Sequence, residues 1–540
     1  MSQNPANARL ARSILPFVAI AALTAAGCGG ATPSPSGGTP SPGGGTVTPA
    51  AACGLDLGTA EPDATIFGAS AGDFLADRFS LATGDFNGDG TDDVLVGAPL
   101  ADGPNDERRD AGEAYVVFGG RELAGTIDLA KETPGLAVRG GAIGGNMGFT
   151  VASGDVNGDD FDDVIVGARF AAPDPATQAD HGEVYVIFGG KDLRGTVDID
   201  SGQQDVTLVG ARSGDFLGIA LAAGDINGDG LDDLIMGASD ADGPGNTRAG
   251  AGAISVVLGA EDLPSLIDLG REDAYLTVWG GSPDDHVPNY LSSGDLDGDG
   301  DSELLVGAPA AGTAPAEERP RGEAYVVGLS GVPKGEVDLA TVEGFTRLRG
   351  AKQLDGFGFY VTAADLNADG LDDAIIGARD ADGGSDARNN AGEAHVLFGR
   401  EDLPAFMDMA EAPLDVTLIG ADLNDSLGHT LASGDLNGDG TADLLVGAPL
   451  ADGCQNRAPE AGEAFAILGR RDWNQTIDLA SGGYDVRVSG RDSEDSLGFS
   501  LASGDLNGDG KDDIVAGALT ADGPDNSRPD AGEAYVILSR

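Results

Sequence analysis

A nine-residue, carboxylate-rich loop recurs seven times in this chain at one fixed interval. Each loop starts 70 residues after the previous one, and the starting residues are Asp85, Asp155, Asp225, Asp295, Asp365, Asp435 and Asp505. A period that is kept seven times without a net insertion indicates an array of equivalent modules. Because every module carries the same loop, we expect every module to bind the same kind of cation.

The order of oxygen-bearing side chains in the loop is typical of a calcium site. The first loop reads Asp85-Phe86-Asn87-Gly88-Asp89-Gly90-Thr91-Asp92-Asp93, with side-chain oxygens at positions 1, 3, 5 and 9 and glycine at position 6. Position 7 would add a backbone carbonyl. Hard oxygen ligands in this number favour calcium over magnesium, which requires a stricter octahedron. An EF-hand needs Glu at position 12, where this chain has apolar residues such as Val96, so the loops should lead into strands.

One Asp-rich loop alone would be weak evidence, because Asp-Gly and Asn-Gly pairs are ordinary turn formers. Seven loops in phase favour metal binding, and we predict up to seven calcium ions. The predicted ligands, at positions 1, 3, 5, 7 and 9 of each loop, are Asp85, Asn87, Asp89, Thr91 and Asp93; Asp155, Asn157, Asp159, Phe161 and Asp163; Asp225, Asn227, Asp229, Leu231 and Asp233; Asp295, Asp297, Asp299, Asp301 and Glu303; Asp365, Asn367, Asp369, Leu371 and Asp373; Asp435, Asn437, Asp439, Thr441 and Asp443; Asp505, Asn507, Asp509, Lys511 and Asp513.

Two loops depart from the common pattern. The second has Asp160 at position 6, where glycine is usual and a positive φ is expected, a conformation that Asp tolerates less well than Gly. The fourth has Asp297 in place of Asn and ends in Glu303, so it carries an extra charge and a longer side chain. We expect the second loop to bind calcium most weakly.

The composition agrees with a metal-loaded protein. The chain has 90 acidic and 31 basic residues, and seven divalent ions would change the formal net charge from −59 to −45. Without metal, the carboxylates at positions 1, 5 and 9 would crowd together, so ion binding and folding should be strongly linked. Nucleic acid is an improbable partner for such an acidic surface.

The N-terminus has the pattern of an export signal and a tether. Arg9 and Arg12 precede a short apolar run that ends at Ala26-Gly27-Cys28, which resembles the lipobox of bacterial lipoproteins, although Ala25 stands where Leu is commonest. The resemblance implies acylation of Cys28; the alternative is a plain signal peptide. We therefore assign residues 1–27 to the signal peptide, 28–53 to a Gly/Pro/Ser/Thr-rich spacer and 54–540 to the repeat domain. No later run is long and apolar enough to cross a membrane.

Only two other cysteines exist, Cys53 and Cys454. Secretion permits a disulfide between them. Each, however, stands where the other repeats have an unrelated residue, and the architecture predicted below would place them on opposite faces of neighbouring modules. The bridge is left open, with the balance against it.

Each 70-residue unit is expected to form four short strands. In the first unit these are 79–83, 93–97, 113–118 and 136–139, rich in Val, Tyr, Phe and Leu and bounded by Gly and Asp. The predicted metal loop joins the first strand to the second, and no amphipathic helix is evident. Four antiparallel strands in each of seven units predict an all-β fold, a seven-bladed β-propeller.

The chain ends give an independent indication of closure. The last unit stops at Arg540 after its third strand, 533–538, whereas 64–69 before the first unit matches the fourth-strand segment 206–211. We therefore predict that an N-terminal strand completes blade 7. Such a closed ring has no exposed edge strand.

These motifs resemble the FG-GAP repeat of integrin α-subunit propellers and of many bacterial surface proteins, over about residues 55 to 540. The first half of the motif is seen at Gly148-Phe149, Gly358-Phe359 and Gly498-Phe499, and is lost at Arg78-Phe79 and Pro288-Asn289. The second half is seen at Gly97-Ala98-Pro99, Gly307-Ala308-Pro309 and Gly447-Ala448-Pro449, with Arg, Ser or Leu third elsewhere. The resemblance implies calcium in the loops between first and second strands. It implies neither a partner subunit nor a ligand.

A ligand is expected on the face opposite the metal loops, where long segments join the second and third strands. These segments carry an arginine at nearly constant phase in six units, with Gln178 in the other: Arg108, Arg248, Arg319, Arg388, Arg457 and Arg528. The arginines are interpreted either as a basic ring for acidic groups on a glycan or as inter-blade clasps that pair with acidic neighbours such as Asp102 or Asp242. The regular phase favours the clasps.

Evidence for catalysis is thin. The four histidines, His181, His286, His395 and His429, stand at positions occupied by unrelated residues in other units, and the chain has no Ser-centred nucleophile elbow and no HExxH. The favoured hypothesis is a surface-anchored, calcium-binding adhesion or ligand-binding scaffold, attached by its lipid to the bacterial envelope, at the outer membrane or cell surface, with an unknown protein or glycan partner. The alternatives are a propeller enzyme acting on polysaccharide or lipid and a purely structural envelope protein.

Overall fold

The computed structural model describes residues 54–103, 107–121, 123–131, 135–172, 180–271, 274–312, 319–329, 334–341, 345–384 and 388–540. The predicted signal peptide, Cys28, the spacer and Gln178 lie outside these ranges, so the structure does not test them. No helix in the described ranges has the length and apolar character needed to span a membrane.

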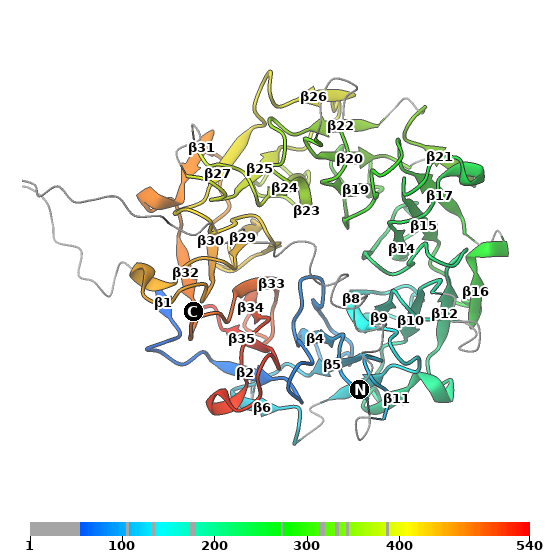
Figure 1. The fold of residues 1–540 in the computed structure, drawn as a ribbon, viewed down its shortest axis with the longest axis horizontal. Coiled ribbons are helices and arrows are strands. Elements are labelled where there is room, and N and C mark those ends of the chain that lie inside the picture. Colours follow the sequence, from blue (N-terminus) through cyan, green and yellow to red (C-terminus); the bar gives the residue numbers. More distant parts are fainter. Residues whose placement is uncertain are drawn as a thin grey trace, which may run out of the picture. The chain divides into compact units, whose positions relative to one another are not determined.

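Seven sheets stand around a ring, and each has its first strand innermost (Figure 1). From the inside outward, the seven sheets are β3 (Leu81–Gly84), β4 (Asp93–Ala98), β5 (Glu113–Val117), β7 (Leu136–Arg139) and β11 (Gly195–Asp198); β8 (Met147–Gly154), β9 (Asp163–Ala168), β10 (Glu183–Ile187), β12 (Val206–Val209) and β16 (Leu266–Asp268); β13 (Leu221–Gly224), β14 (Asp233–Ala238), β15 (Ala253–Val257), β17 (Leu276–Trp279) and β21 (Gly335–Asp338); β18 (Tyr290–Gly294), β19 (Glu303–Ala308), β20 (Glu323–Val327), β22 (Thr346–Arg349) and β26 (Phe406–Asp408); β23 (Phe357–Ala364), β24 (Asp373–Ala378), β25 (Glu393–Leu397), β27 (Val416–Ile419) and β31 (Thr476–Asp478); β28 (Leu431–Gly434), β29 (Asp443–Ala448), β30 (Glu463–Ile467), β32 (Val486–Ser489) and β1 (Leu55–Asp56); β33 (Leu497–Gly504), β34 (Asp513–Ala518), β35 (Glu533–Ile537), β2 (Ala64–Phe67) and β6 (Gly125–Asp128).

The prediction of a seven-bladed propeller is confirmed, with one addition. The four inner strands of each blade are antiparallel, as expected, and a fifth, parallel strand lies outside them. In the first blade β11 pairs with β7 in the register Leu136↔Gly195 to Arg139↔Asp198. In six blades the fifth strand comes from the following unit, with unit 1 following unit 7, and so it ties consecutive blades together; in blade 6 it is β1 of the N-terminal segment.

The apolar core lies between the blades. Every second strand is buried along its whole length, because it has a neighbouring strand on each side and a neighbouring blade on each face. The core cluster around Val94 and Val96 of β4 also contains Ile66 of β2 and Val515 of β34, which belong to blade 7. In the described ranges the helical elements are three-residue 3-10 turns, namely η3 (Ile199–Ser201), η4 (Pro244–Asn246), η5 (Leu269–Arg271), η6 (Cys454–Asn456), η7 (Leu479–Ser481) and η8 (Pro524–Asn526).

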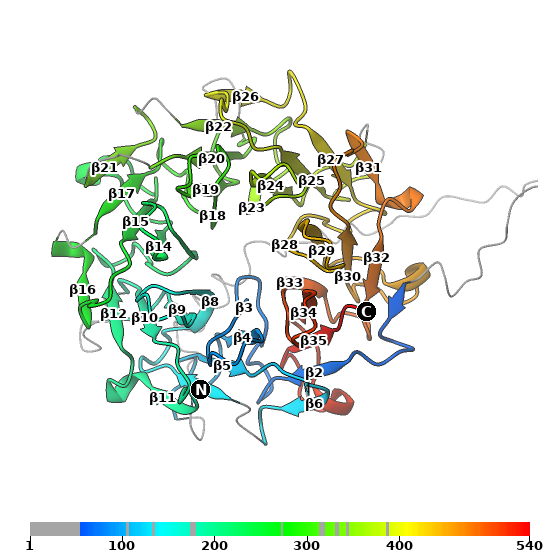
Figure 2. The ribbon, with the colours of Figure 1, turned by 180° about the vertical axis from the view of Figure 1, so that it is seen from behind.

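The N-terminal segment closes the ring, as predicted. Strand β2 pairs with β35 from Ala64↔Val536 to Phe67↔Glu533, and the two strands lie side by side in both views (Figures 1 and 2). Beyond the prediction, β1 also adds a parallel strand to blade 6, with Leu55 opposite Val488. One short segment thus completes two blades.

The arginines of the long segments act mainly as clasps. Arg108 donates two hydrogen bonds of 2.9 Å to the carboxylate of Asp198, and Asp198 lies on the fifth strand that unit 2 contributes. Bidentate pairs of this kind fix geometry as well as adding energy. Equivalent pairs join Arg248 to Asp338, Arg388 to Asp478 and Arg528 to Asp128.

The predicted clasp partners were wrong, and so were two of the predicted arginines. Asp102 and Asp242 accept backbone N–H groups within their own loops. In unit 4 the clasp to Asp408 is made by Arg321 and not by Arg319, and Arg321 stands three positions after the phase of Arg108. Arg457 hydrogen-bonds Gln455 in its own loop.

One end of the possible Cys53–Cys454 disulfide lies within the described residues. Cys454 is 7% exposed and disulfide-bonded. Its partner lies outside the described residues, so the pairing with Cys53 is not tested.

Candidate calcium-binding loops

All seven Asp-rich loops lie at the same end of the blades. Each follows the innermost strand and precedes the buried second strand, as between β3 and β4. The structure therefore gathers the 35 predicted ligand residues into seven equivalent loops around one end of the ring. No loop is displaced from this position.

The loop backbone is organised around the carboxylate at position 1. In the sixth loop the Asp435 carboxylate accepts the N–H groups of Gly438, Asp439 and Gly440 at 2.8, 3.0 and 2.7 Å. The Asp439 carboxylate accepts the N–H of Thr441 at 3.0 Å. These bonds curl the loop so that its side-chain oxygens face one another.

Positions 3 and 9 meet in the interior of the loop. In the first loop the amide nitrogen of Asn87 donates to both carboxylate oxygens of Asp93 at 3.1 and 3.0 Å. This orientation leaves the amide oxygen of Asn87 available for a cation. Asp93 is fully buried and also accepts the N–H of Gly119 at 2.8 Å, which fixes it to the third strand.

The position-9 carboxylate is costly to ionise without a cation. Burial raises the pKa of Asp93 to about 7, and repulsion from Asp89 and Asp85 adds to the shift. The pKa is also raised to about 7 in Asp163, Asp233, Glu303 and Asp373 and to about 6 in Asp443 and Asp513. Across the described residues, no Lys or Arg forms an ion pair with positions 1, 5 or 9 of any loop. This oxygen-rich donor set fits a divalent ion, which would supply a countercharge for the carboxylates.

Three carboxylates of the fourth loop lie close together. Asp295, Asp297 and Glu303 each offer an oxygen within 4.8 Å of the others, which is suitable for a single ion. The longer Glu303 side chain keeps the common bond to the N–H of Leu296, at 2.8 Å. Asp297, the extra carboxylate of this loop, therefore lies close to two other predicted ligands.

A ring of aspartates at position 8 links neighbouring loops and was missed from the sequence. Asp162 accepts the N–H of Asp85 from the adjacent blade at 2.8 Å, and burial raises its pKa. The same bond is made by Asp92, Asp232, Asp372 and Asp512. Ser302 and Ala442 interrupt the ring. The signal was present as a repeated Asp-Asp pair, but only position 9 of the pair was assigned a role.

Two loops contain strained residues. Asp160 has φ of +67°, as predicted for the second loop, and Ala368 at position 4 of the fifth loop has φ of +57°, which was not anticipated. Non-glycine residues in this region cost roughly 1–2 kcal/mol, and Asp costs less than Ala. The backbone conformations of the second and fifth loops therefore carry a free-energy cost that glycine at these positions would reduce.

We expect Asp160→Gly and Ala368→Gly each to raise the free energy of unfolding in calcium by up to about 1 kcal/mol. Gly90→Ala is the matched control, because a Cβ there meets no atom within 4 Å and so adds backbone strain alone. It should lower stability by a similar amount. Denaturation in calcium measures the free energy of unfolding of all three variants. A calcium titration in which the second loop fills before the others contradicts the expectation that this loop binds calcium most weakly.

The raised pKa values predict an unusual pH dependence for the chelated protein. Asp93 titrates at about 7 when folded and at 3.8 in its ordinary state, so the folded form holds extra protons between these values. Stability without calcium should therefore fall as pH rises from about 4 to 7. Melting at pH 5 and 8 in chelator tests this, and added calcium should remove or reverse the difference. A chelated protein that is more stable at pH 8 would refute it.

Comparison with known proteins agrees with this geometry. The FG-GAP repeat family matches residues 79–117, 147–187, 217–257, 291–327, 427–466 and 497–537. Each match begins near a first strand, runs through a loop and ends at or near the end of a third strand. The fifth blade lies outside the matched residues, although it has the same strand order.

Curated relatives fall into two groups. The chain is 24% identical to phosphatidylinositol-glycan-specific phospholipase D of Dictyostelium discoideum over 80% of its own length and 48% of the relative. It is 32% identical to the human protein of that name over 30% of this chain and 18% of the relative. It is 35% identical to integrin alpha-5 of Xenopus laevis over 30% of this chain and 15% of the relative. The match spans about half of the first relative and less of the others. The chain is thus a β-propeller in which six segments match the FG-GAP repeat, and it is similar to integrin alpha subunits and to phosphatidylinositol-glycan-specific phospholipase D.

Proposed function

We propose that this protein is a calcium-loaded scaffold that binds a protein or glycan at the cell surface. The observation that carries the proposal is the contrast between the two ends of the ring. Seven equivalent Asp-rich loops, which we propose to bind calcium, lie at one end, while segments of more varied sequence join second and third strands at the other. Variable loops on a rigid framework are the usual place for binding.

The lipid anchor is part of the proposal. Cys28 and the spacer of about 24 residues would hold the propeller away from a membrane, and several acyl chains on one cysteine give stable attachment. Wild-type protein should therefore fractionate with membranes and move into detergent. Cys28→Ser should lose this behaviour without changing calcium binding, and a wild-type protein that is wholly soluble after secretion contradicts the anchor.

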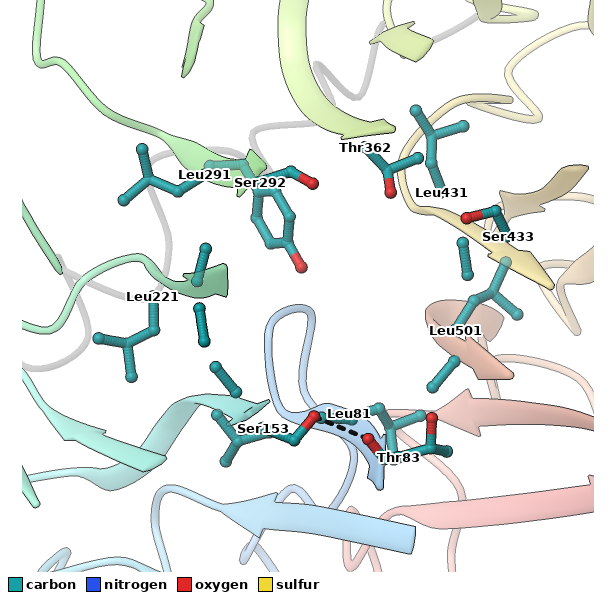
Figure 3. Close-up of a pocket in the computed structure, with 18 of the residues that line it drawn as sticks. Leu81, Thr83, Ser153, Leu221, Leu291, Ser292, Thr362, Leu431, Ser433 and Leu501 are labelled. Carbon is teal, nitrogen blue, oxygen red and sulfur yellow. Dashed lines mark hydrogen bonds between the residues drawn. The ribbon is translucent and has the colours of Figure 1, made fainter. Parts of the chain in front are cut away.

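An enzyme is the second candidate, because phosphatidylinositol-glycan-specific phospholipases D are among the relatives. About half or more of each such relative lies outside the match, so their activity does not transfer. The central channel contains a cavity of about 300 Å³ lined by the first strands (Figure 3). Its described lining consists of Leu, Val, Ala, Ser, Thr and Tyr, without a carboxylate or imidazole for acid–base chemistry.

The channel hydroxyls join the blades. The Ser153 hydroxyl donates to the Thr83 carbonyl at 2.7 Å, drawn as a dashed line in Figure 3, and the Thr83 hydroxyl donates to the Ser503 carbonyl at 2.6 Å. Each bond crosses from one innermost strand to the next. These hydroxyl groups already donate hydrogen bonds to carbonyl groups of neighbouring blades, so they are poorly placed to act as nucleophiles.

The histidines do not favour the enzyme hypothesis either. Burial lowers the pKa of His395 to about 4 and lowers that of His429 further below its ordinary value, with Arg379 and Arg78 adding to the second shift. His286 pairs with Asp240 at 2.8 Å on a different loop. The structure does not bring these residues together as a catalytic group.

Binding and catalysis can be separated in one experiment. The calcium-loaded protein is applied to an array of glycans and extracellular matrix proteins, and retained ligands are then incubated with it and analysed for products. The scaffold predicts retention that chelation abolishes, without product. Cleavage of a glycan or a phosphatidylinositol-glycan anchor favours the enzyme, and no retention on any surface contradicts the scaffold.

A further inference from the structure

Three arginines meet near the axis, at the end of the ring opposite the calcium loops. Arg78 precedes the innermost strand β3, and Arg169 and Arg379 directly follow the second strands β9 and β24. First strands run toward the calcium loops and second strands run away from them. All three residues therefore lie at the end where a ligand is proposed to bind.

An aromatic cluster holds these arginines. The guanidinium carbon of Arg169 lies 3.5 Å from the ring centre of Phe149, and that of Arg379 lies 3.8 Å from Phe359. Arg78 lies 4.8 Å from Phe79 and 5.2 Å from Phe359. Stacking of this kind stabilises a cation through its face and leaves the N–H groups at its edge available.

The cluster crosses the ring. Phe79 of blade 1 lies 5.0 Å from Tyr290 of blade 4, and Tyr290 stacks on Tyr360 of blade 5 at 3.7 Å. The unit 1 segment that carries Arg78 thus reaches the far side of the axis. This places Arg78 within the electrostatic reach of both Arg169 and Arg379, which come from blades 2 and 5.

Arg78 and Arg169 have no carboxylate partner within the described residues. No ion pair or side-chain hydrogen bond links either guanidinium to an acid, and the buried Nε of each has no acceptor. Arg379 differs, because it pairs with Asp380 at 3.4 Å. Asp77 is the nearby acid whose charge partly opposes the lowering of the pKa of both arginines by burial, without forming an ion pair with either.

This lack of partners is unusual in so acidic a chain. The protein has 90 acidic residues, and five clasp arginines each have a carboxylate from another unit. Burial and repulsion from Arg379 lower the pKa of Arg78 to about 10. Like charges held together in a partly buried place have a free-energy cost that a bound anion would offset.

We propose that Arg78 and Arg169 bind the carboxylate of a single acidic sugar at the end of an otherwise neutral oligosaccharide. Planar guanidinium groups match a carboxylate in bidentate geometry. Phe170 lies beside Arg169 and packs edge-to-face on Phe216 at 5.3 Å. These two half-buried rings offer an apolar surface for the sugar ring. This assignment rests on the proposed scaffold function and names its ligand class.

The overall charge selects against a polyanion. A protein of formal charge −59 repels a ligand with many negative groups, whereas a single carboxylate placed between two guanidinium groups gains from the local positive potential. At physiological salt this repulsion acts over about 8 Å, so it is felt by those acidic groups of a polyanion that lie close to the protein surface. We therefore expect one acidic residue per ligand to bind better than a chain of them.

The test uses calorimetry on the full-length, calcium-loaded protein. The probe is a neutral oligosaccharide ending in glucuronic acid, and its glucose-ended counterpart is the neutral reference. The acidic probe should bind at least about tenfold more tightly than the neutral one, and Arg78→Gln and Arg169→Gln should each weaken it about tenfold. Asp77→Asn should strengthen binding, because it removes the competing carboxylate.

Arg108→Gln is the control, because Arg108 is a clasp in a surface segment and its loss should leave affinity unchanged. Melting in calcium confirms that each variant is folded. The site is overturned if the wild-type protein does not bind the acidic probe. It is also overturned if the two axial variants, Arg78→Gln and Arg169→Gln, both bind the acidic probe as the wild type does. Tighter binding of a polyuronate, or of a peptide with one C-terminal carboxylate, overturns the sugar assignment. Array ligands that are still retained by both axial variants leave the scaffold intact while removing this site.

Discussion

Chelation of calcium is expected to lower the melting temperature of this protein by about 20 °C. A site held at about 100 times its dissociation constant contributes about 2.7 kcal/mol to the stability of the folded state. Seven such sites contribute about 19 kcal/mol in total. The unfolding entropy of nearly 490 residues is about 1 kcal/mol/K, so each kcal/mol corresponds to about 1 °C.

The structural reason is that the loops are part of the ring. Asp93 is buried and bonded to Gly119, and position-8 aspartates join five of the seven pairs of neighbouring loops. Repulsion between the carboxylates of one loop therefore also strains the neighbouring blade. Melting is measured in calcium, in chelator, and in chelator with excess calcium restored. Magnesium is the matched control and should restore little. An unchanged melting temperature in chelator would show that the loops are ordinary turns.

The repeat made most of the fold predictable. A strand order repeated every 70 residues determines the blade, and the incomplete last unit requires a strand from the other end of the chain. The fifth strands were not predicted because they are only two to four residues long and partly exposed, and so lack the alternation that marks a half-buried strand.

The partners between units were the hardest features to predict. Arg108 pairs with Asp198, 90 residues away, and this offset becomes meaningful only once the fifth strand is known. The predicted partner Asp102 was a nearer acid in sequence. Arg169 and Arg379 stand at the third position of the Gly-Ala-Pro motif, where they were read as simple departures from it. Their common direction toward the axis depends on the closed ring.

The second large effect is expected from removal of the N-terminal strands. Deleting residues 54–70 should cause aggregation or lower the melting temperature by more than 10 °C, whereas deleting 29–52 should leave both unchanged. The first deletion removes β1 and β2 together. Ile66 and Ala64 are fully buried in the core between blades 7 and 1. Truncation of an Ile or Leu side chain in a protein core lowers the free energy of unfolding by about 2–5 kcal/mol.

The lost strand also exposes backbone. Without β2, β35 has an unpaired edge and β6 has no partner, because β2 is bonded to both. Unpaired edges of this kind invite pairing with another chain. Ile66→Asn is the point variant that tests packing without removing backbone, and it should destabilise the protein without the same tendency to aggregate. Light scattering and calorimetry in calcium distinguish the three variants. Equal behaviour of the two deletions would mean that blade 7 does not need its N-terminal strand to close the ring.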